Sequence, residues 1–252
     1  MHYSWYWKVL LETEPGGTGS YLYYLIVGLG WTLATAAAAW VIALLVGGFV
    51  GTVRTTTATW AVRIGNLYVE IFRNVPLIVQ MFLWFFVFPE FLPQALGDWI
   101  KQQPPPWGMY IPAVLCLGIF TSVRVAEQVR AGINSLPRGQ RMAATALGLT
   151  QAQAYRFVIL PQAFRIVLPP LTSESMNIIK NSSVAYTIGL LELMGRAKAM
   201  QEFSFHVFEA FASATVIYLL TNLVVVLLMR ALEKKVRVPG LIAAAGAPQA
   251  GH

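Results

Sequence analysis

The sequence predicts an all-α integral membrane protein. Of its 252 residues, 57% are hydrophobic and only 12% are charged, with a mean hydropathy of +0.60, which is far too apolar for an ordinary soluble domain. The apolar residues gather in runs close to or above the roughly 20 residues that a helix needs to cross the hydrocarbon core. These runs predict transmembrane helices at about 22–52, 66–88, 109–131, 171–190 and 209–230.

The basic residues predict the orientation of these helices. The net charge is +7, but the Lys and Arg residues lie in the gaps between apolar runs, where the positive-inside rule places them, so the charge indicates topology rather than nucleic-acid binding. Five spans with the N-terminus outside and the C-terminus in the cytoplasm bring one set of basic residues to the cytoplasmic side. The set is Arg54, Arg63, Arg138, Arg141, Arg156, Arg165, Lys234, Lys235 and Arg237.

The remaining segments are expected to lie outside the membrane. Residues 1–20 mix aromatic residues with a Pro-Gly-Gly break and suit an external interfacial segment, and no cleavable signal is evident. Residues 89–107 and 192–206 are expected to be external connections, and the Ala/Gly-rich 239–252 a disordered tail.

Cys116 stands alone in an apolar run, the three histidines are far apart, and no phosphate-binding loop occurs, so we expect no catalytic residue and no metal site.

The stretch 134–170 is a basic, amphipathic segment between apolar runs, and its pattern predicts two short helices. Ser135 is a candidate cap for the first helix, and Gly148 supplies the left-handed position that commonly ends one. Thr150 with Gln153 predicts a capping box that opens the second helix, which is expected to end before Leu160. The alternatives are a solvated basic loop or a DNA-binding helix-turn-helix, and the flanking apolar runs argue against the latter.

This stretch also carries a resemblance to a known family. The order Ala143-Ala144, then Gly148, then Val158-Ile159-Leu160-Pro161 is similar to the cytoplasmic loop of ABC import permeases of the type I class. The resemblance implies that the loop is the coupling helix that docks on the ATPase, through Ala143, Ala144, Gly148, Leu160 and Pro161. Two positions depart from the family pattern: Met142 stands for Glu, and Val158 for Ile.

The resemblance extends over most of the chain, from about residue 21 to 240. The strings 72–80 and 124–140 resemble polar amino acid permeases, closest to those for glutamate and aspartate. It implies a permease domain over 21–238 in the bacterial inner membrane, with no enzymatic activity of its own. It also implies an ATPase dimer that holds ATP and Mg, a homologous permease subunit, a periplasmic solute-binding protein and an acidic amino acid as substrate, with no cofactor in this chain.

Arg124 is the first candidate for substrate binding. It departs from the family, which more often has Tyr there, and a guanidinium can bind a carboxylate bidentately in a low-dielectric path. Two alternatives are open: Arg124 pairs with Glu127 one turn away, or it extends to the inner interface. Glu70 and Arg73 are likewise spaced to pair with each other on one helix face.

A polar stripe in the fourth span supplies the other candidates. Ser173, Asn177, Lys180 and Thr187 fall near one helical face, which should line the protein interior or a wet path. Asn177 and Thr187 are candidate hydrogen-bonding groups for the substrate, as is Ser183. Lys180 is a second cation, and its alternative role is to pair with one of three carboxylates: Glu70, Glu127 or Glu174.

Other functions stay open at this level. A permease of the same family could carry another polar amino acid such as glutamine. An ion-coupled carrier could use a relay of charged residues, namely Glu70, Glu127, Glu174 and Lys180. A membrane scaffold without transport would tolerate changes at Arg124 and Lys180. The two-helix cytoplasmic loop argues against the carrier and the scaffold.

Overall fold

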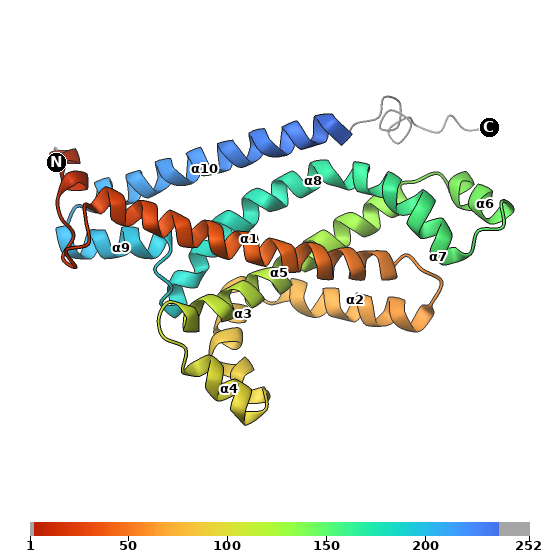
Figure 1. The fold of residues 1–252 in the computed structure, drawn as a ribbon, viewed down its shortest axis with the longest axis horizontal. Coiled ribbons are helices and arrows are strands. Elements are labelled where there is room, and N and C mark those ends of the chain that lie inside the picture. Colours follow the sequence, from red (N-terminus) through yellow and green to blue (C-terminus); the bar gives the residue numbers. More distant parts are fainter. Residues whose placement is uncertain (1–2, 237–252) are drawn as a thin grey trace.

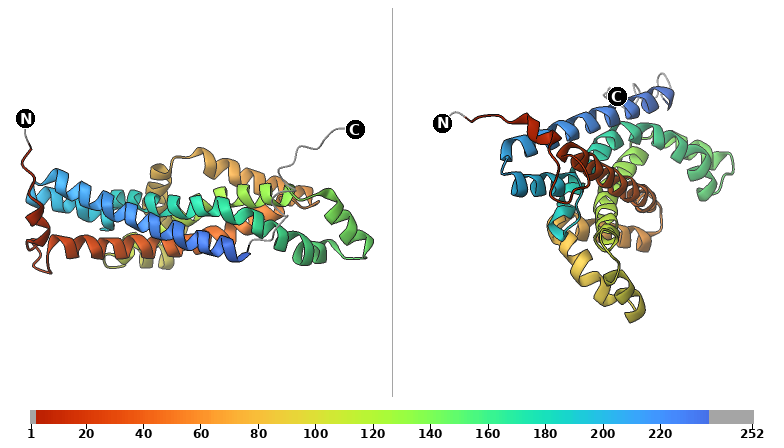
Figure 2. Two further views of the ribbon diagram at one scale, coloured as in Figure 1. Left: turned by 90° about the horizontal axis from the view of Figure 1, so that it is seen from above. Right: turned by 60° about the vertical axis from the view of Figure 1, so that its left-hand side comes forward.

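The computed structural model describes residues 3–236, and every regular element in that range is a helix (Figure 1). The all-helical prediction is confirmed. The bundle is elongated: α1, α5, α8 and α10 run side by side along it, and α6 and α7 project at one end (Figures 1 and 2). The α-helices are α1 (Tyr21–Val53), α2 (Thr59–Asn74), α3 (Leu77–Phe82), α4 (Gln94–Lys101), α5 (Trp107–Asn134), α6 (Arg138–Ala146), α7 (Gln151–Ala154), α8 (Leu160–Asn181), α9 (Leu193–Ser204) and α10 (Val207–Val236). Shorter helical turns are η1 (Trp7–Leu11), η2 (Leu83–Val87), η3 (Phe88–Phe91), η4 (Tyr155–Ile159) and η5 (Ser182–Ile188).

Within residues 3–236, three helices are long and apolar enough to cross a membrane, namely α1, α5 and α10. The pair α2 and α3 adds a fourth if it is counted as one bent span. The span expected over 171–190 does not form a single helix: α8 begins at Leu160 and ends at Asn181, and the 3-10 turn η5 continues the chain to Ile188. Charged residues within α8, such as Arg165 and Glu174, make it too polar to be recognised as a span by composition.

The span expected over 66–88 is broken. α2 and the helical segment Leu77–Phe91 meet at 102°, so one straight helix there is wrong. Val75 precedes a proline and has an extended backbone (φ −99°, ψ 126°), the conformation that Pro76 imposes on its predecessor. The buried Gln80 side chain stabilises the break, because its Nε2 donates to the carbonyls of Phe72 at 2.9 Å and Val75 at 3.0 Å.

The close packing of α1 against α5 depends on glycine. A methyl group at Gly47 would lie 2.5 Å from the carbonyl oxygen of Ser122, and one at Gly51 would lie 2.6 Å from that of Ala126. Both distances are shorter than van der Waals contact, so a larger residue would force the two backbones apart. This approach of small residues is the usual way for helices to associate where no hydrophobic force drives them together.

We therefore expect Gly47→Ala to destabilise the bundle by about 1–3 kcal/mol, the usual cost of overpacking. The measurement is the thermal unfolding midpoint of the purified protein in detergent. Gly48→Ala is the matched control, because nothing lies within 4 Å of a methyl group there. A midpoint for Gly47→Ala equal to that of Gly48→Ala would contradict the packing account.

The region expected as an external connection over 192–206 forms α9, which packs against α1 and α10. Glu192, directly before α9, is fully buried with 0% exposure. Its Oε2 accepts hydrogen bonds from Thr32 Oγ1 of α1 at 3.0 Å and from the Tyr218 hydroxyl of α10 at 2.9 Å, and its Oε1 accepts from the Gly195 amide at 2.9 Å. One carboxylate thus joins three helices.

The N-terminal segment lies across the end of the bundle where α10 begins (Figure 1). The buried Glu209 accepts from the Tyr6 amide at 2.7 Å and from the Tyr3 hydroxyl. Trp5 and Trp7 stack with ring centroids 5.4 Å apart and stay half exposed. Exposed tryptophans are typical of the interfacial position expected for this segment. The tail expected over 239–252 lies outside the described residues.

Candidate functional site

The loop of residues 134–170 forms the two short helices that the sequence predicts, α6 and α7. Gly148 has a left-handed backbone with φ 76° and follows the end of α6. Thr150 and Gln153 form the expected capping box, with the Thr150 amide donating to Gln153 Oε1 at 2.9 Å and the Gln153 amide donating to Thr150 Oγ1 at 3.3 Å. The loop is therefore a folded unit that local sequence signals specify.

Two details of this prediction are wrong. The second helix does not end before Leu160, because α7 continues through the π-helical turn η4 directly into α8. Pro161 is the second residue of α8 and directly follows this π-helical turn. Ser135 does not cap α6 either, since its hydroxyl donates to the Gly132 carbonyl at 2.8 Å at the end of α5.

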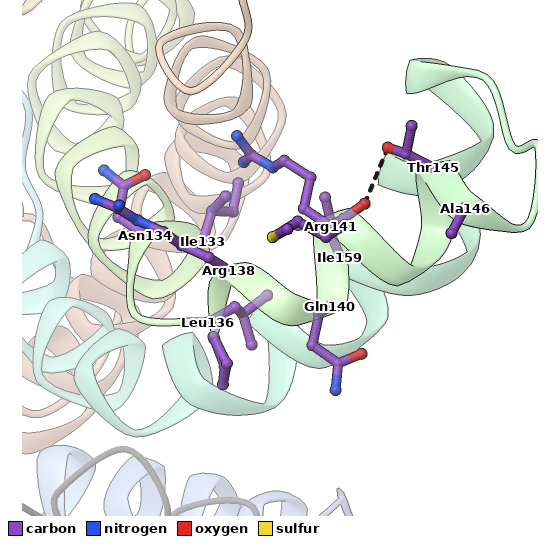
Figure 3. A pocket seen from close by; sticks show the side chains of 11 residues that line it. Ile133, Asn134, Leu136, Arg138, Gln140, Arg141, Thr145, Ala146 and Ile159 are labelled. Carbon is purple, nitrogen blue, oxygen red and sulfur yellow. Dashed lines mark hydrogen bonds between the residues drawn. The ribbon is translucent and has the colours of Figure 1, made fainter. Parts of the chain in front are cut away.

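A cavity of about 900 Å³ lies between α6 and the end of α5 (Figure 3). Ile133, Leu136, Arg138 and Arg141 are among the residues that line it. Met142, which also lines this cavity, and Leu147 are 70% and 81% exposed.

The five coupling residues that the resemblance implies divide by burial. Ala144 is buried, Leu160 is half-buried, and the others are exposed, namely Ala143, Gly148 and Pro161. The end of the bundle therefore exposes apolar side chains, small residues and arginines.

A polar cluster joins α5 and α8 around the buried carboxylate of Glu174. Arg124 Nη1 lies 3.6 Å from Glu174 Oε2, Gln128 Nε2 donates to Oε1 at 3.3 Å, and Asn177 Nδ2 donates to Oε2 at 3.5 Å. All three contacts are long, and the Arg124 side chain is still 46% exposed. The guanidinium lies 5.2 Å from the centroid of the Phe120 ring, so it contacts both Phe120 and Glu174 while part of it stays exposed.

Two candidate residues form no hydrogen bond or ion pair with this cluster. Lys180 and Thr187 are exposed, and Lys180 forms no ion pair with any carboxylate in residues 3–236. The hydroxyls of Thr187 and Ser183 donate to the carbonyls of Val184 and Lys180, both at 2.7 Å. The structure therefore brings Arg124 and Asn177 together through Glu174, and leaves Lys180 and Thr187 on the open face of α8 and η5.

From the sequence, Gln128 was not a candidate, and Glu174 was considered only as a partner for Lys180 or as a member of an ion relay. The available signal was helical spacing: Gln128 lies four residues after Arg124, and Glu174 three before Asn177. What the spacing could not supply is that these two helix faces meet.

The other ion pairs differ from the alternatives set out above. Glu127 lies 2.9 Å from Arg54 Nη1, at the end of α1, and not beside Arg124. Glu70 and Arg73 form no ion pair among the described residues, although Asn74 Nδ2 donates to the Glu70 carbonyl at 2.8 Å. The buried Arg54 also donates to Asn66 Oδ1 at 2.8 Å, so it ties α1, α2 and α5 together.

Comparison with known proteins gives several relatives. The glutamate/aspartate import permease protein GltJ of Escherichia coli K12 is 47% identical over 95% of this chain and 98% of its own length. The probable glutamine ABC transporter permease protein GlnM of Bacillus subtilis is 33% identical over 68% of this chain and 74% of its own length. Among solved structures, an amino acid ABC transporter crystallised with histidines has a TM-score of 0.71 at 30% identity, covering 85% of this chain and 95% of that one.

A family model identifies the family of this chain. The model for the binding-protein-dependent transport system inner membrane component matches residues 43–238. That range contains α5, α8, the polar cluster and the whole loop with its two helices, α6 and α7. This chain, all-helical over residues 3–236 and with the fold of type I ABC permeases, belongs to the family of inner membrane components of binding-protein-dependent transport systems.

Proposed function

We propose that this chain is a transmembrane permease subunit of an ATP-driven importer for the acidic amino acids glutamate and aspartate. The observation that carries the proposal is a half-exposed arginine, Arg124, on the face that α5 and α8 share. The folded loop of α6 and α7 at one end of the bundle supports the ATP-driven part. The name of the Escherichia coli relative supports the choice of substrate.

Arg124 suits a substrate with a side-chain carboxylate. A guanidinium presents a rigid fork of donors that matches the two carboxylate oxygens, and charge-assisted hydrogen bonds of this kind are the strong ones. The 3.6 Å separation from Glu174 is too long for a tight ion pair. A substrate carboxylate can therefore replace part of this contact, while Glu174 keeps its contacts with Gln128 and Asn177.

The exposed polar face of α8 and η5 supports a second permease subunit. Ser173, Lys180 and Thr187 are exposed, and a helix face with these residues is costly against lipid. Covering it with a homologous subunit would enclose a wet path between the two chains. We place Arg124, Asn177, Lys180 and Thr187 on that path as the substrate-binding residues.

The topology and the other partners complete the proposal. The chain would cross the membrane five times within residues 21–238, with the N-terminus outside and the C-terminus in the cytoplasm. The loop of residues 134–170 would dock on an ATPase dimer, which binds ATP and Mg, and a periplasmic solute-binding protein would deliver the substrate on the other side. Substrate would then pass through the path as the ATPase dimer closes and opens.

The experiment that tests this function is uptake into proteoliposomes containing the full complex. We expect radiolabelled glutamate and aspartate to enter only when ATP reaches the ATPase, and uptake to persist when a protonophore collapses the proton gradient. Glutamine serves as the competing polar substrate of the same class. Uptake that needs the gradient but not ATP would instead favour an ion-coupled carrier, and ATP-driven uptake of glutamine alone would reject the acidic substrates.

A further inference from the structure

Tyr155 is a joint between the cytoplasmic loop and the first two helices. It is the first residue of η4 and is only 7% exposed. Its hydroxyl donates to the carbonyl of Thr55 at 2.6 Å and lies 3.1 Å from Thr55 Oγ1, across about a hundred residues of sequence. The same hydroxyl accepts from Arg141 Nη2 of α6 at 3.3 Å. One phenol thus contacts α6 on one side and the α1–α2 connection on the other.

A further side-chain hydrogen bond joins α6 to the bundle, in which Gln162 Nε2 of α8 donates to Gln140 Oε1 at 3.4 Å. The cavity of about 900 Å³ lies between α6 and the end of α5 (Figure 3). The guanidinium of Arg141 lies 5.5 Å from the centroid of the Tyr155 ring, in addition to its hydrogen bond to the hydroxyl. A second, exposed link joins α7 to the same connection, where Thr57 Oγ1 donates to Gln151 Oε1 at 3.3 Å.

The α1–α2 connection, which the Tyr155 hydroxyl contacts, is held rigidly. Thr55 follows the buried Arg54, which donates to Asn66 of α2 at 2.8 Å and pairs with Glu127 of α5 at 2.9 Å. The Tyr155 ring also packs in a small core with Ile133 and Ile159. A displacement of α6 that reaches the Tyr155 hydroxyl is therefore passed to the ends of α1 and α2 and not absorbed by a flexible loop.

We infer that the Tyr155 hydroxyl is a positioning group that couples movement of α6 to the α1–α2 connection. This inference rests on the proposed function, in which α6 docks on the ATPase and moves with it. The joint gives the ATPase a route to α1 and α2, in addition to the continuous path through η4 into α8. Contiguous contacts of this kind carry conformational coupling only where the helices can adopt discrete alternative arrangements.

The test compares Tyr155→Phe with Tyr110→Phe in the reconstituted complex. Both variants remove a tyrosine hydroxyl that donates to a backbone carbonyl of the N-terminal helical region, since the Tyr110 hydroxyl donates to the Ala34 carbonyl at 3.2 Å. Only Tyr155 lies beside the cytoplasmic loop. We expect Tyr155→Phe to keep basal ATP hydrolysis but to import about fivefold less substrate per ATP, the ratio that corresponds to one lost hydrogen bond. Tyr110→Phe should keep the parent ratio.

A distance measurement separates coupling from a merely structural role. Spin labels on the exposed residues Thr59 and Thr145 report the separation of α2 and α6. In the parent complex, we expect the α2–α6 separation to stay the same when nucleotide is trapped, because both elements move together. In Tyr155→Phe, trapping nucleotide should change this separation.

Three results would overturn the inference. The first is a parent-like import ratio for Tyr155→Phe in a complex that imports with ATP. The second is a lower ratio with an unchanged distance response, which would indicate only lost stability. The third is a parent complex without ATP-driven uptake, which would reject the proposed function first and the joint with it.

Discussion

Replacing Arg124 with Gln should lower glutamate and aspartate uptake about ten- to a hundredfold, because charge-assisted hydrogen bonds contribute about 1.5–3 kcal/mol. Glutamine, whose side chain needs no cation, should lose much less. ATP hydrolysis by the complex should stay near the parent rate, since Arg124 lies on α5 at the face shared with α8 and not in the cytoplasmic loop. The measurement is initial uptake rates of the three amino acids in proteoliposomes.

The neighbouring carboxylate provides the decisive control. If Arg124 serves only to neutralise Glu174, then Arg124→Gln leaves an uncompensated buried charge, and the double variant Arg124→Gln with Glu174→Gln should restore uptake. If Arg124 binds substrate, the double variant should stay as deficient as the single one. Recovery of glutamate uptake in the double variant would return Arg124 to the role of a structural ion pair.

Replacing Glu192 with Leu should remove most of the folded protein. The change leaves the Thr32 and Tyr218 hydroxyls and the Gly195 amide without their acceptor in a fully buried site. Each buried group left unpaired costs about 1–3 kcal/mol, and the sum is a large fraction of the roughly 5–15 kcal/mol that stabilises a typical protein. Fluorescence-detected gel filtration of a tagged chain measures the monodisperse fraction.

Two further variants serve as comparisons for this expected loss of folded protein. Glu192→Gln keeps one carbonyl oxygen as acceptor and should be intermediate. Glu202→Leu removes a carboxylate whose side chain is 56% exposed and whose partner is Lys198, in an ion pair at 3.2 Å, and it should leave the yield unchanged. A Glu192→Leu protein that elutes like the parent would show that the three-helix contact contributes little.

The parts of this molecule that were predictable from sequence are those that local signals specify. Gly148 ends α6 because a left-handed position suits glycine, and Thr150 with Gln153 opens α7 because two orphan amides need acceptors within three residues. The apolar runs of α1 and α10 fix two membrane helices by length alone. None of these features depends on what lies far away in the chain.

The features that the sequence did not reveal depend on distant partners. Arg124 is 50 residues from Glu174, and a nearer carboxylate at Glu127 offered the simpler pairing, which Arg54 takes instead. Glu192 looked like part of a hydrophilic connection, and only the packing of α9 between α1 and α10 buries it. Pro76 lies inside the range expected as one span, and the break there is stabilised by Gln80, whose side chain donates to the carbonyls of Phe72 and Val75.

The most direct test of the account is whether an acidic amino acid occupies the face of α5 and α8. Ser173→Cys places a reactive thiol on the exposed side of α8, and the native Cys116 is buried and should not compete. In the reconstituted complex, glutamate and aspartate should slow alkylation of this thiol, glutamine should slow it less, and Arg124→Gln should abolish the protection by the acidic substrates. Equal alkylation rates with and without glutamate, in a complex that imports glutamate, would contradict the placement of the substrate path along Arg124.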